Sequence, residues 1–181
     1  SSFKYQYNII LASIKKFCTA DFHSFSKAIF DFYLSLYYRE SNEILSVSKI
    51  ISSLDGFKDN AAYLNATYLS VGRTLYQFGR ISDSLEYFER YIDTLDANVD
   101  SSNVYIAYSN LIEGLLLVRN FEKSRLYLER FKQLEFGSEH FVSRYKPRIK
   151  WLSALITYYR SPTTNMFAIT DLIRKRTPYY Q

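Results

Sequence analysis

Residues 65–96 read NATYLSVGRTLYQFGRISDSLEYFERYIDTLD, and this stretch decides the fold. Apolar and small side chains recur at steps of three and four on each side of a break at Gly79-Arg80. They are Tyr68, Val71, Gly72 and Leu75 before the break, and Ile81, Ser84, Phe88 and Tyr91 after it. Such steps place side chains on one face of a helix. The stretch therefore predicts two amphipathic helices joined by a tight turn and packed as a hairpin.

The same pattern returns in residues 105–136. Tyr108, Leu111, Ile112 and Leu115 precede Arg119-Asn120, and Phe121, Ser124, Leu128 and Phe131 follow it. Ser84 and Ser124 are about 40 residues apart, as are Tyr91 and Phe131. Because a single hairpin cannot bury its apolar faces alone, a fixed period of this kind predicts stacked hairpins that share one core.

The order of large aromatic, aliphatic with glycine, turn glycine, small residue and aromatic in the first stretch resembles a tetratricopeptide repeat. The resemblance implies close helix packing at Gly72, a small-residue position at Ser84 and a large aromatic position at Phe88. The sequence departs from the family at Tyr91, where the usual residue is small, and at Asp96, where proline is usual. Its period also exceeds the usual length of roughly 34 residues. The resemblance is therefore to a divergent repeat.

Weaker patterns on both sides of the two repeats predict further helices. They cover residues 3–19, 22–39, 43–54, a segment whose first turn contains Pro147, and 162–176. Asp55-Gly56 is expected to end the third of these, and Pro147 suits a first turn because its missing N–H costs nothing there. The chain is thus expected to be all-α, with about nine helices in a single domain over residues 1–181. The resemblance implies a right-handed α-solenoid of antiparallel helix pairs, and the first residue, Ser rather than Met, fits a fragment of a longer protein.

No pattern for catalysis, metal binding or cofactor binding is found in the sequence. Cys18 is the only cysteine, and the histidines His23 and His140 are far apart, so no zinc site or Cys–His pair is expected. There is no phosphate-binding glycine loop, no HExxH and no GxSxG. No signal peptide and no apolar run of about 18 residues is present. We therefore expect a protein that is not an enzyme, has no cofactor and has no membrane span.

The carboxylates of the central region have an ordinary explanation. Residues 81–140 hold 11 Asp and Glu against six basic residues. Paired carboxylates can do acid–base chemistry, but most of these fall on outward helix faces. There Glu86 can pair with Arg90 one turn on, and Glu122 can pair with Arg125. A solvated helix face is therefore expected.

The end of the chain differs in charge. Residues 141–181 carry eight basic residues and one acidic residue, Asp171. Arg174, Lys175 and Arg176 are consecutive and form a basic surface. Such a surface can attract nucleic acid, an anionic membrane surface or an acidic neighbouring domain. Nucleic-acid binding is not favoured, since no known binding motif accompanies the charge.

The candidate binding site is implied by the resemblance. In tetratricopeptide proteins the first helix of each pair lines a concave face, and side chains beside the packing stripe point into it. This implies a partner-binding set of Asn65, Leu69, Arg73, Tyr76, Gln77, Tyr105, Ser109 and Glu113. Tyr, Arg and Asn supply ring area and hydrogen bonds for an extended peptide. For Leu69 and Tyr76 a place in the core is the alternative.

We expect a scaffold or adaptor that binds a protein or peptide in the concave face of a solenoid. The alternative is the peptide-sensing domain of a bacterial transcriptional or signalling regulator, which the repeat of about 40 residues and the basic C-terminal region fit. An enzyme with a site between helices is a third class, but few polar residues occupy inward positions. No small-molecule substrate is expected, and a terminal repeat with an exposed apolar face could self-associate. The single cysteine slightly favours the cytoplasm and also fits a secreted protein.

Overall fold

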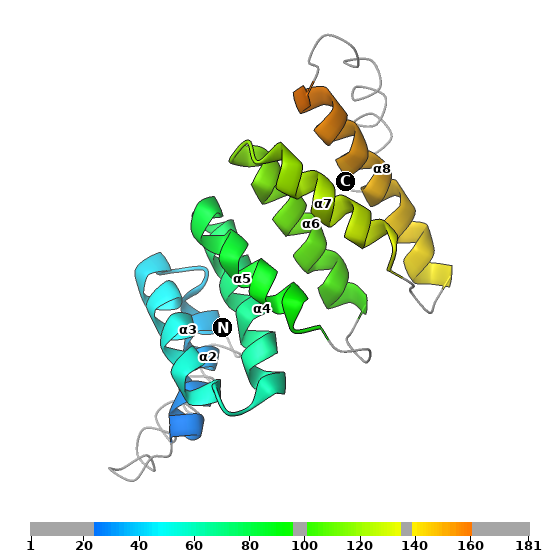
Figure 1. The fold of residues 1–181 in the computed structure, drawn as a ribbon. Helices are drawn as coiled ribbons and strands as arrows, with labels where there is room; N and C mark the ends of the chain where they lie inside the picture. Colours follow the sequence, from blue (N-terminus) through cyan, green and yellow to red (C-terminus); the bar gives the residue numbers. More distant parts are fainter. Residues whose placement is uncertain (1–23, 96–100, 135–138, 161–181) are drawn as a thin grey trace. The chain divides into compact units, whose positions relative to one another are not determined.

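The computed structural model describes residues 24–95, 101–134 and 139–160, and within these ranges the chain forms helices and turns but no strands (Figure 1). The seven helices are α2 (Ser24–Tyr38), α3 (Glu43–Phe57), α4 (Ala61–Gln77), α5 (Ile81–Asp93), α6 (Ser101–Leu117), α7 (Phe121–Lys132) and α8 (Glu139–Arg160). The all-α class predicted from the sequence is confirmed for this part of the chain. The helices expected over residues 3–19 and 162–176 lie outside the described residues. The chain divides into two compact units, residues 1–64 and 65–181.

The α4–α5 and α6–α7 turns of the second unit have the same backbone geometry. In each turn an N–H donates to the carbonyl five residues earlier, Arg80 to Leu75 at 2.9 Å and Asn120 to Leu115 at 2.8 Å. Gly79 and Arg119 occupy the matching turn position with φ of 75° and 60°. This conformation is easy for glycine and costs about 1–2 kcal/mol for arginine. The period found in the sequence is therefore also a repeat of backbone geometry.

Buried serines mark the second helix of three hairpins. Ser46, Ser84 and Ser124 lie at the fourth position of α3, α5 and α7 and are fully buried. Each hydroxyl donates to a main-chain carbonyl, at distances between 2.7 and 2.9 Å, which offsets the cost of burying it. A Cβ added to Gly72 would lie 2.9 Å from the ring of Phe88, which is itself fully buried. The close packing expected at Gly72 is confirmed.

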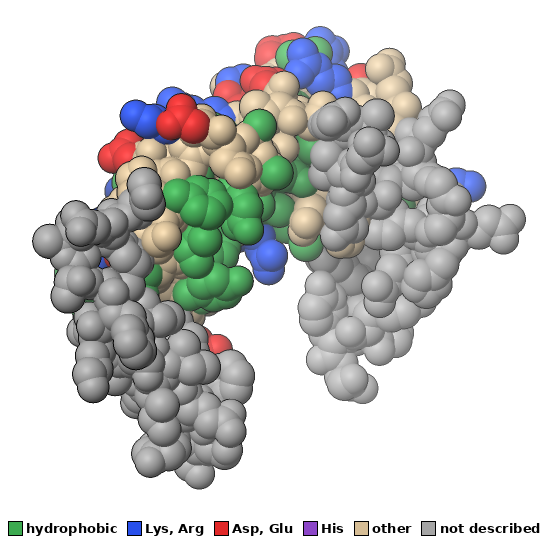
Figure 2. Space-filling model, turned by 90° about the horizontal axis from the view of Figure 1, so that it is seen from below, with side chains coloured by type: hydrophobic (Ala, Val, Ile, Leu, Met, Phe, Trp, Pro, Cys, Tyr) green, Lys and Arg blue, Asp and Glu red, His purple; other side chains and the backbone are tan. Residues whose placement is uncertain are grey.

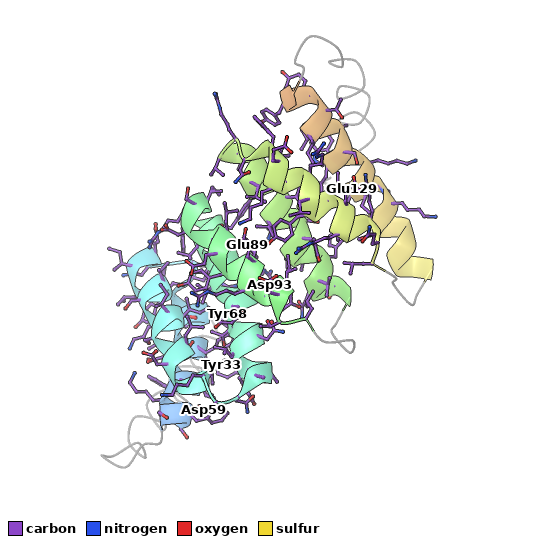
Figure 3. All side chains as sticks on the ribbon, viewed as in Figure 1. Tyr33, Asp59, Tyr68, Glu89, Asp93 and Glu129 are labelled. Carbon is purple, nitrogen blue, oxygen red and sulfur yellow. The ribbon has the colours of Figure 1, made fainter. Side chains whose placement is uncertain are left out.

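A polar contact joins the second helices of neighbouring hairpins. The Lys123 ammonium of α7 lies 2.6 Å from the carboxylate of Glu89 on α5. Figure 3 shows Glu89 and Asp93 following each other along α5. Burial, together with the nearby negative charges of Glu89 and Asp93, raises the pKa of Tyr127 to about 12. Tyr127 of α7 therefore remains a neutral hydroxyl beside two carboxylates of α5.

Aromatic rings form the centre of the core in the second unit. Phe131 is fully buried, and its ring stacks on Tyr108 with centroids 5.0 Å apart. The ring of Tyr145 meets Phe131 edge to face at 4.5 Å, and its hydroxyl donates to the Phe131 carbonyl. That carbonyl belongs to the last turn of α7, where helix carbonyls lack an N–H partner within the helix. Tyr145 therefore joins α8 to α7 by ring packing and by a hydrogen bond.

In the first unit, α3 continues through Gly56, so the expected helix end at Asp55-Gly56 is wrong. A Cβ added to Gly56 would lie 2.4 Å from the Ser24 carbonyl oxygen and 2.5 Å from the Ala28 Cβ. Gly56 is therefore needed for the close approach of α2 to α3, and not for ending the helix. At the other end of α3 the side chain of Asn42 accepts a hydrogen bond from the Leu45 N–H at 3.0 Å and caps the helix.

A buried carboxylate also joins α2 to α3. Asp31 is 1% exposed and accepts hydrogen bonds from Lys27 (2.7 Å), Lys49 (3.0 Å) and Ser52 (2.8 Å). Burial alone would raise the pKa of Asp31, but these three hydrogen bonds favour the charged form and hold it below its usual value of 3.8. Folding therefore favours the ionised carboxylate.

Asp31→Asn is expected to lower the free energy of unfolding by about 1–2 kcal/mol at neutral pH, since exposure of Lys27 weakens part of the interaction. Because the folded pKa is the lower one, the stabilisation is present above the unfolded pKa and disappears as pH falls through the folded value. Urea unfolding followed by circular dichroism should show the two proteins converging as the pH falls further and further below 3.8. Asp83→Asn, at an exposed pair with Arg80, should change stability by under about 0.5 kcal/mol. A pH-independent difference for Asp31→Asn would contradict this.

Pro147 does not lie in the first turn of its helix as expected. The helix begins at Glu139, so Pro147 lies inside α8. Pro147 is exposed. A proline nitrogen has no hydrogen to donate to the carbonyl four residues earlier in the helix, and on an exposed helix face water can take its place. The described part of α8 packs against both α6 and α7 through the buried residues Tyr145, Leu152 and Ile156.

Charged residues of α5 and α7 pair along their own helices. Arg90 lies 2.5 Å from Glu86, and Arg125 lies 2.9 Å from Glu122, as expected from the sequence. All four side chains are more than half exposed. Figure 2 shows charged side chains gathered along one border of the displayed face, with apolar side chains beside them. The pairs form solvated helix surfaces, where each contributes about 0.3–0.5 kcal/mol.

Candidate functional site

Three helices of the second unit each bring one polar side chain to a common cluster, formed by Tyr76 of α4, Glu113 of α6 and Arg148 of α8. The Arg148 guanidinium lies 2.7 Å from the Glu113 carboxylate, and these side chains are 10% and 25% exposed. Burial raises the pKa of Tyr76, Glu113 raises it further and Arg148 lowers it, so both charges act on the Tyr76 hydroxyl. A Cβ added to Gly114 would lie 3.5 Å from the Tyr76 ring, which places that ring against α6.

The cluster contains buried donors that have no partner among the described residues. The Nε and Nη1 atoms of Arg148 are buried and have no hydrogen-bond partner among the described residues, and the same holds for the Ser109 hydroxyl. A buried polar group in this condition costs about 1–3 kcal/mol, and native proteins usually satisfy it with water or a bound group. The arrangement can hold a small neutral hydrogen-bond acceptor such as water in the interior. It offers no nucleophile paired with a base.

The predicted residues of α4 fall into different environments. Arg73 and Gln77 are exposed, and Tyr76 is half-buried in the cluster with its ring 6.2 Å from that of Phe88. Leu69 is only 5% exposed and belongs to the hydrophobic core, so its side chain does not lie on a free surface. Asn65 is half-buried and donates to the Thr94 carbonyl at 3.2 Å, at the C-terminal end of α5.

The predicted residues of α6 divide in the same way. Glu113 joins the cluster. Ser109 is 3% exposed and therefore lies in the interior instead of on an exposed surface. Tyr105 is half-buried and packs its ring against Phe131 and Tyr145, with centroids 6.1 and 6.2 Å away. Ser109 corresponds to Leu69 in the repeat, and both are buried for the same positional reason.

Arg148 was not among the residues predicted for the site. In the sequence, Arg148 is one of several basic residues of the C-terminal region. Only the fold shows that it pairs with Glu113. The basic surface predicted at Arg174, Lys175 and Arg176 lies outside the described residues.

The described residues hold no group of three or more His, Cys, Asp or Glu side chains placed to bind a metal ion. Within the same ranges, no helix combines the length and the apolar character required to cross a bilayer. Comparison of the chain with protein-family models, curated proteins and solved structures gave no match. The class of protein is therefore defined by its helices: an all-α chain with repeated helical hairpins.

Proposed function

We propose that this chain is a non-catalytic scaffold that binds a protein or peptide, and that its hairpins belong to a tetratricopeptide-like, right-handed solenoid. The observation that carries the proposal is the grouping of Tyr76, Glu113 and Arg148 from the three helices α4, α6 and α8. A site built from several repeats suits an extended ligand, because successive helices can contact successive residues of a peptide.

Exposed residues beside the cluster supply further contacts. Arg73 and Gln77 are exposed on α4, within one turn of Tyr76. The exposed position of Arg73 allows its guanidinium to contact a partner. Glu113 and Arg148 form an ion pair, so together they carry no net charge. They can hydrogen-bond to the main chain of a bound peptide without a preference for a charged peptide side chain. This combination supports binding of a peptide backbone with an anchoring contact at Arg73.

The proposal is tested by selecting peptides from a random-sequence display library and measuring their affinity by fluorescence anisotropy. Arg73→Glu should weaken a selected peptide at least about 10-fold, as truncating or reversing a central interface arginine does. Arg125→Glu is the matched control, because Arg125 is an exposed helical arginine on α7 and its loss should leave affinity within about twofold. Equal affinities for all three proteins would contradict the proposal.

A second candidate uses the same site in a different setting. A peptide-sensing domain of a bacterial transcriptional or signalling regulator is favoured by the repeat spacing, because the turn hydrogen bonds of Arg80 and Asn120 recur about 40 residues apart. In that setting peptide binding would control an attached domain. Selected peptides that change the activity of a full-length protein, and not only bind this chain, would distinguish the regulator from the scaffold.

A further inference from the structure

Helices α4, α6 and α8 of the second unit can be compared position by position. Gly72, Ile112 and Leu152 follow one another at intervals of 40 residues, and all three are buried. Helix α8 packs against α6. A Cβ added to Gly114 of α6 would lie 3.5 Å from the Tyr76 ring of α4. The three helices therefore follow one another across the unit in a common register.

Each of these helices has an outward face at the same register. In α4 this face consists of residues at steps of four, three and four, namely Ala66, Ser70, Arg73 and Gln77. These residues, the residues 40 positions further on in α6 and the residues 40 positions further again in α8 are all exposed or half-buried. We call them the α4–α6–α8 face.

The charge on the α4–α6–α8 face is one-sided. Arg73, Lys146 and Lys150 are exposed cations at its positions. Glu113 is the only carboxylate of the face, and its charge is balanced by Arg148, whose guanidinium lies 2.7 Å away. The three exposed positive charges therefore have no further carboxylate on the face to balance them.

The helices α5 and α7 have a different charge balance. Together they contain six acidic and five basic residues, whereas α4, α6 and α8 contain two acidic and six basic residues. On α5 and α7 acids and bases also pair along the helix, as Glu86 does with Arg90 and Glu129 does with Lys132. The positive excess of these five helices therefore belongs to α4, α6 and α8.

We propose that the ligand of the peptide site is acidic, and that its side-chain carboxylates contact Arg73, Lys146 and Lys150. The inference rests on the proposed function and names the class of ligand for the same site. Hydrogen bonds from guanidinium and ammonium groups to carboxylates are about twice as strong as those between neutral groups. A surface of one charge sign also attracts partners of the opposite sign and repels those of its own sign.

The composition of the face favours an acidic peptide over a nucleic acid. None of its residues is aromatic, whereas proteins that bind single strands stack the bases on aromatic side chains. Three cations are also few beside a duplex, which carries about one phosphate charge per 1.7 Å of its axis. The other positions of the face hold small, amide, hydroxyl and aliphatic side chains, such as Ser70, Asn110 and Leu117. Such a mixture suits the polar and apolar groups of a peptide.

Peptides selected by the whole chain from a random-sequence display library give the first test. They are synthesised with amidated C-termini, so that only side chains carry negative charge, and their affinity is measured by fluorescence anisotropy. We expect the selected peptides to be rich in Asp and Glu. Replacing these residues by Asn and Gln should weaken binding at least about 10-fold. Raising the salt from about 0.05 to 0.5 M should weaken binding of the acidic peptides but not of their Asn and Gln versions.

Lys146→Gln combined with Lys150→Gln tests the contribution of the α4–α6–α8 face. Both lysines are exposed, so circular dichroism should show unchanged helicity. The double variant should bind an acidic peptide about 5- to 10-fold more weakly, and should bind the Asn and Gln version as well as the unmodified chain does. Arg125→Gln combined with Lys132→Gln is the matched control, because it removes two exposed positive charges from α7. This control should leave both affinities within about twofold.

The failure of this inference can be distinguished from the failure of the proposed function. Selected peptides that are neutral or basic would overturn the acidic ligand while the scaffold still binds peptides. A chain that selects no peptide would contradict both. Equal losses in the lysine variant and its control would also overturn the inference. The same holds if Arg174→Gln, Lys175→Gln and Arg176→Gln abolish binding of acidic peptides and the lysine variant does not. A uridine oligonucleotide that binds more tightly than the acidic peptides and displaces them would assign the face to nucleic acid.

Discussion

Gly56→Ala is expected to lower the free energy of unfolding by about 2–3 kcal/mol, although alanine is the better helix former. The added methyl would lie 2.4 Å from the Ser24 carbonyl oxygen and 2.5 Å from the Ala28 Cβ. Both atoms belong to or adjoin the backbone of α2, so no flexible side chain can move aside. The helices must separate, and the contact between the rings of Phe25 and Phe57, whose centroids are 5.6 Å apart, would weaken. Urea unfolding followed by circular dichroism measures the loss.

Gly79→Ala separates crowding from backbone conformation. Gly79 has φ of 75°, but nothing lies within 4 Å of a Cβ added there. The expected cost is about 1 kcal/mol, because only the left-handed conformation is unfavourable, and Arg119 shows that the matching turn accepts a residue with a side chain. A smaller loss for Gly56→Ala than for Gly79→Ala would show that α2 and α3 are not tightly packed at Gly56.

Gly56 also shows what local sequence could not predict. A glycine after a helical pattern usually indicates a helix end, because it adopts the left-handed conformation easily. In α3 it lies inside the helix, and the reason is a contact with Ser24, 32 residues earlier in the chain. Gly72 was interpreted correctly because the resemblance to a tetratricopeptide repeat implied close helix packing there. The sequence therefore predicted a tertiary role for a glycine only where a resemblance supplied the tertiary context.

The helical hairpins of the second unit could be predicted because their signal is periodic. The stripe through Val71 and Leu75 and the stripe through Ser84 and Phe88 are buried as expected. Local pairs such as Glu86 with Arg90 also follow from spacing within one helix. The helix stripes and the local ion pairs depend on residues a few positions apart in the sequence. They can therefore be predicted without knowledge of the tertiary structure.

The candidate site was predicted less well, for a geometric reason. Its residues on α4 were chosen at steps of four, and each such step rotates about 40° around a helix with 3.6 residues per turn. The line from Asn65 through Leu69 to Gln77 therefore crosses from one helix face to another, and Leu69 falls in the core. Arg148 was missed because its helix was expected to begin at Pro147, which hid its register relative to Glu113.

Phe131→Ala is expected to lower the free energy of unfolding by about 3–5 kcal/mol, the largest effect of any substitution considered. The ring is fully buried, stacks on Tyr108 at 5.0 Å and meets Tyr145 edge to face at 4.5 Å. Its removal leaves a cavity among rigid rings, which cannot collapse as flexible aliphatic side chains would. It also removes the surface that holds the Tyr145 hydroxyl at the Phe131 carbonyl. Urea unfolding followed by circular dichroism gives the change.

Phe121→Ala is the matched control, because it removes the same side chain from the other end of α7. Phe121 is only half-buried, and its stacking partner Tyr159, at 5.9 Å, is 42% exposed, so a cost of about 1–2 kcal/mol is expected. Both variants delete the same atoms. The difference between their losses of unfolding free energy therefore measures the effect of the closed surroundings of the Phe131 ring. If the two losses were equal, Phe131 would not be the centre of a closed aromatic cluster, and the attachment of α8 to α7 would depend instead on its aliphatic residues Leu152 and Ile156.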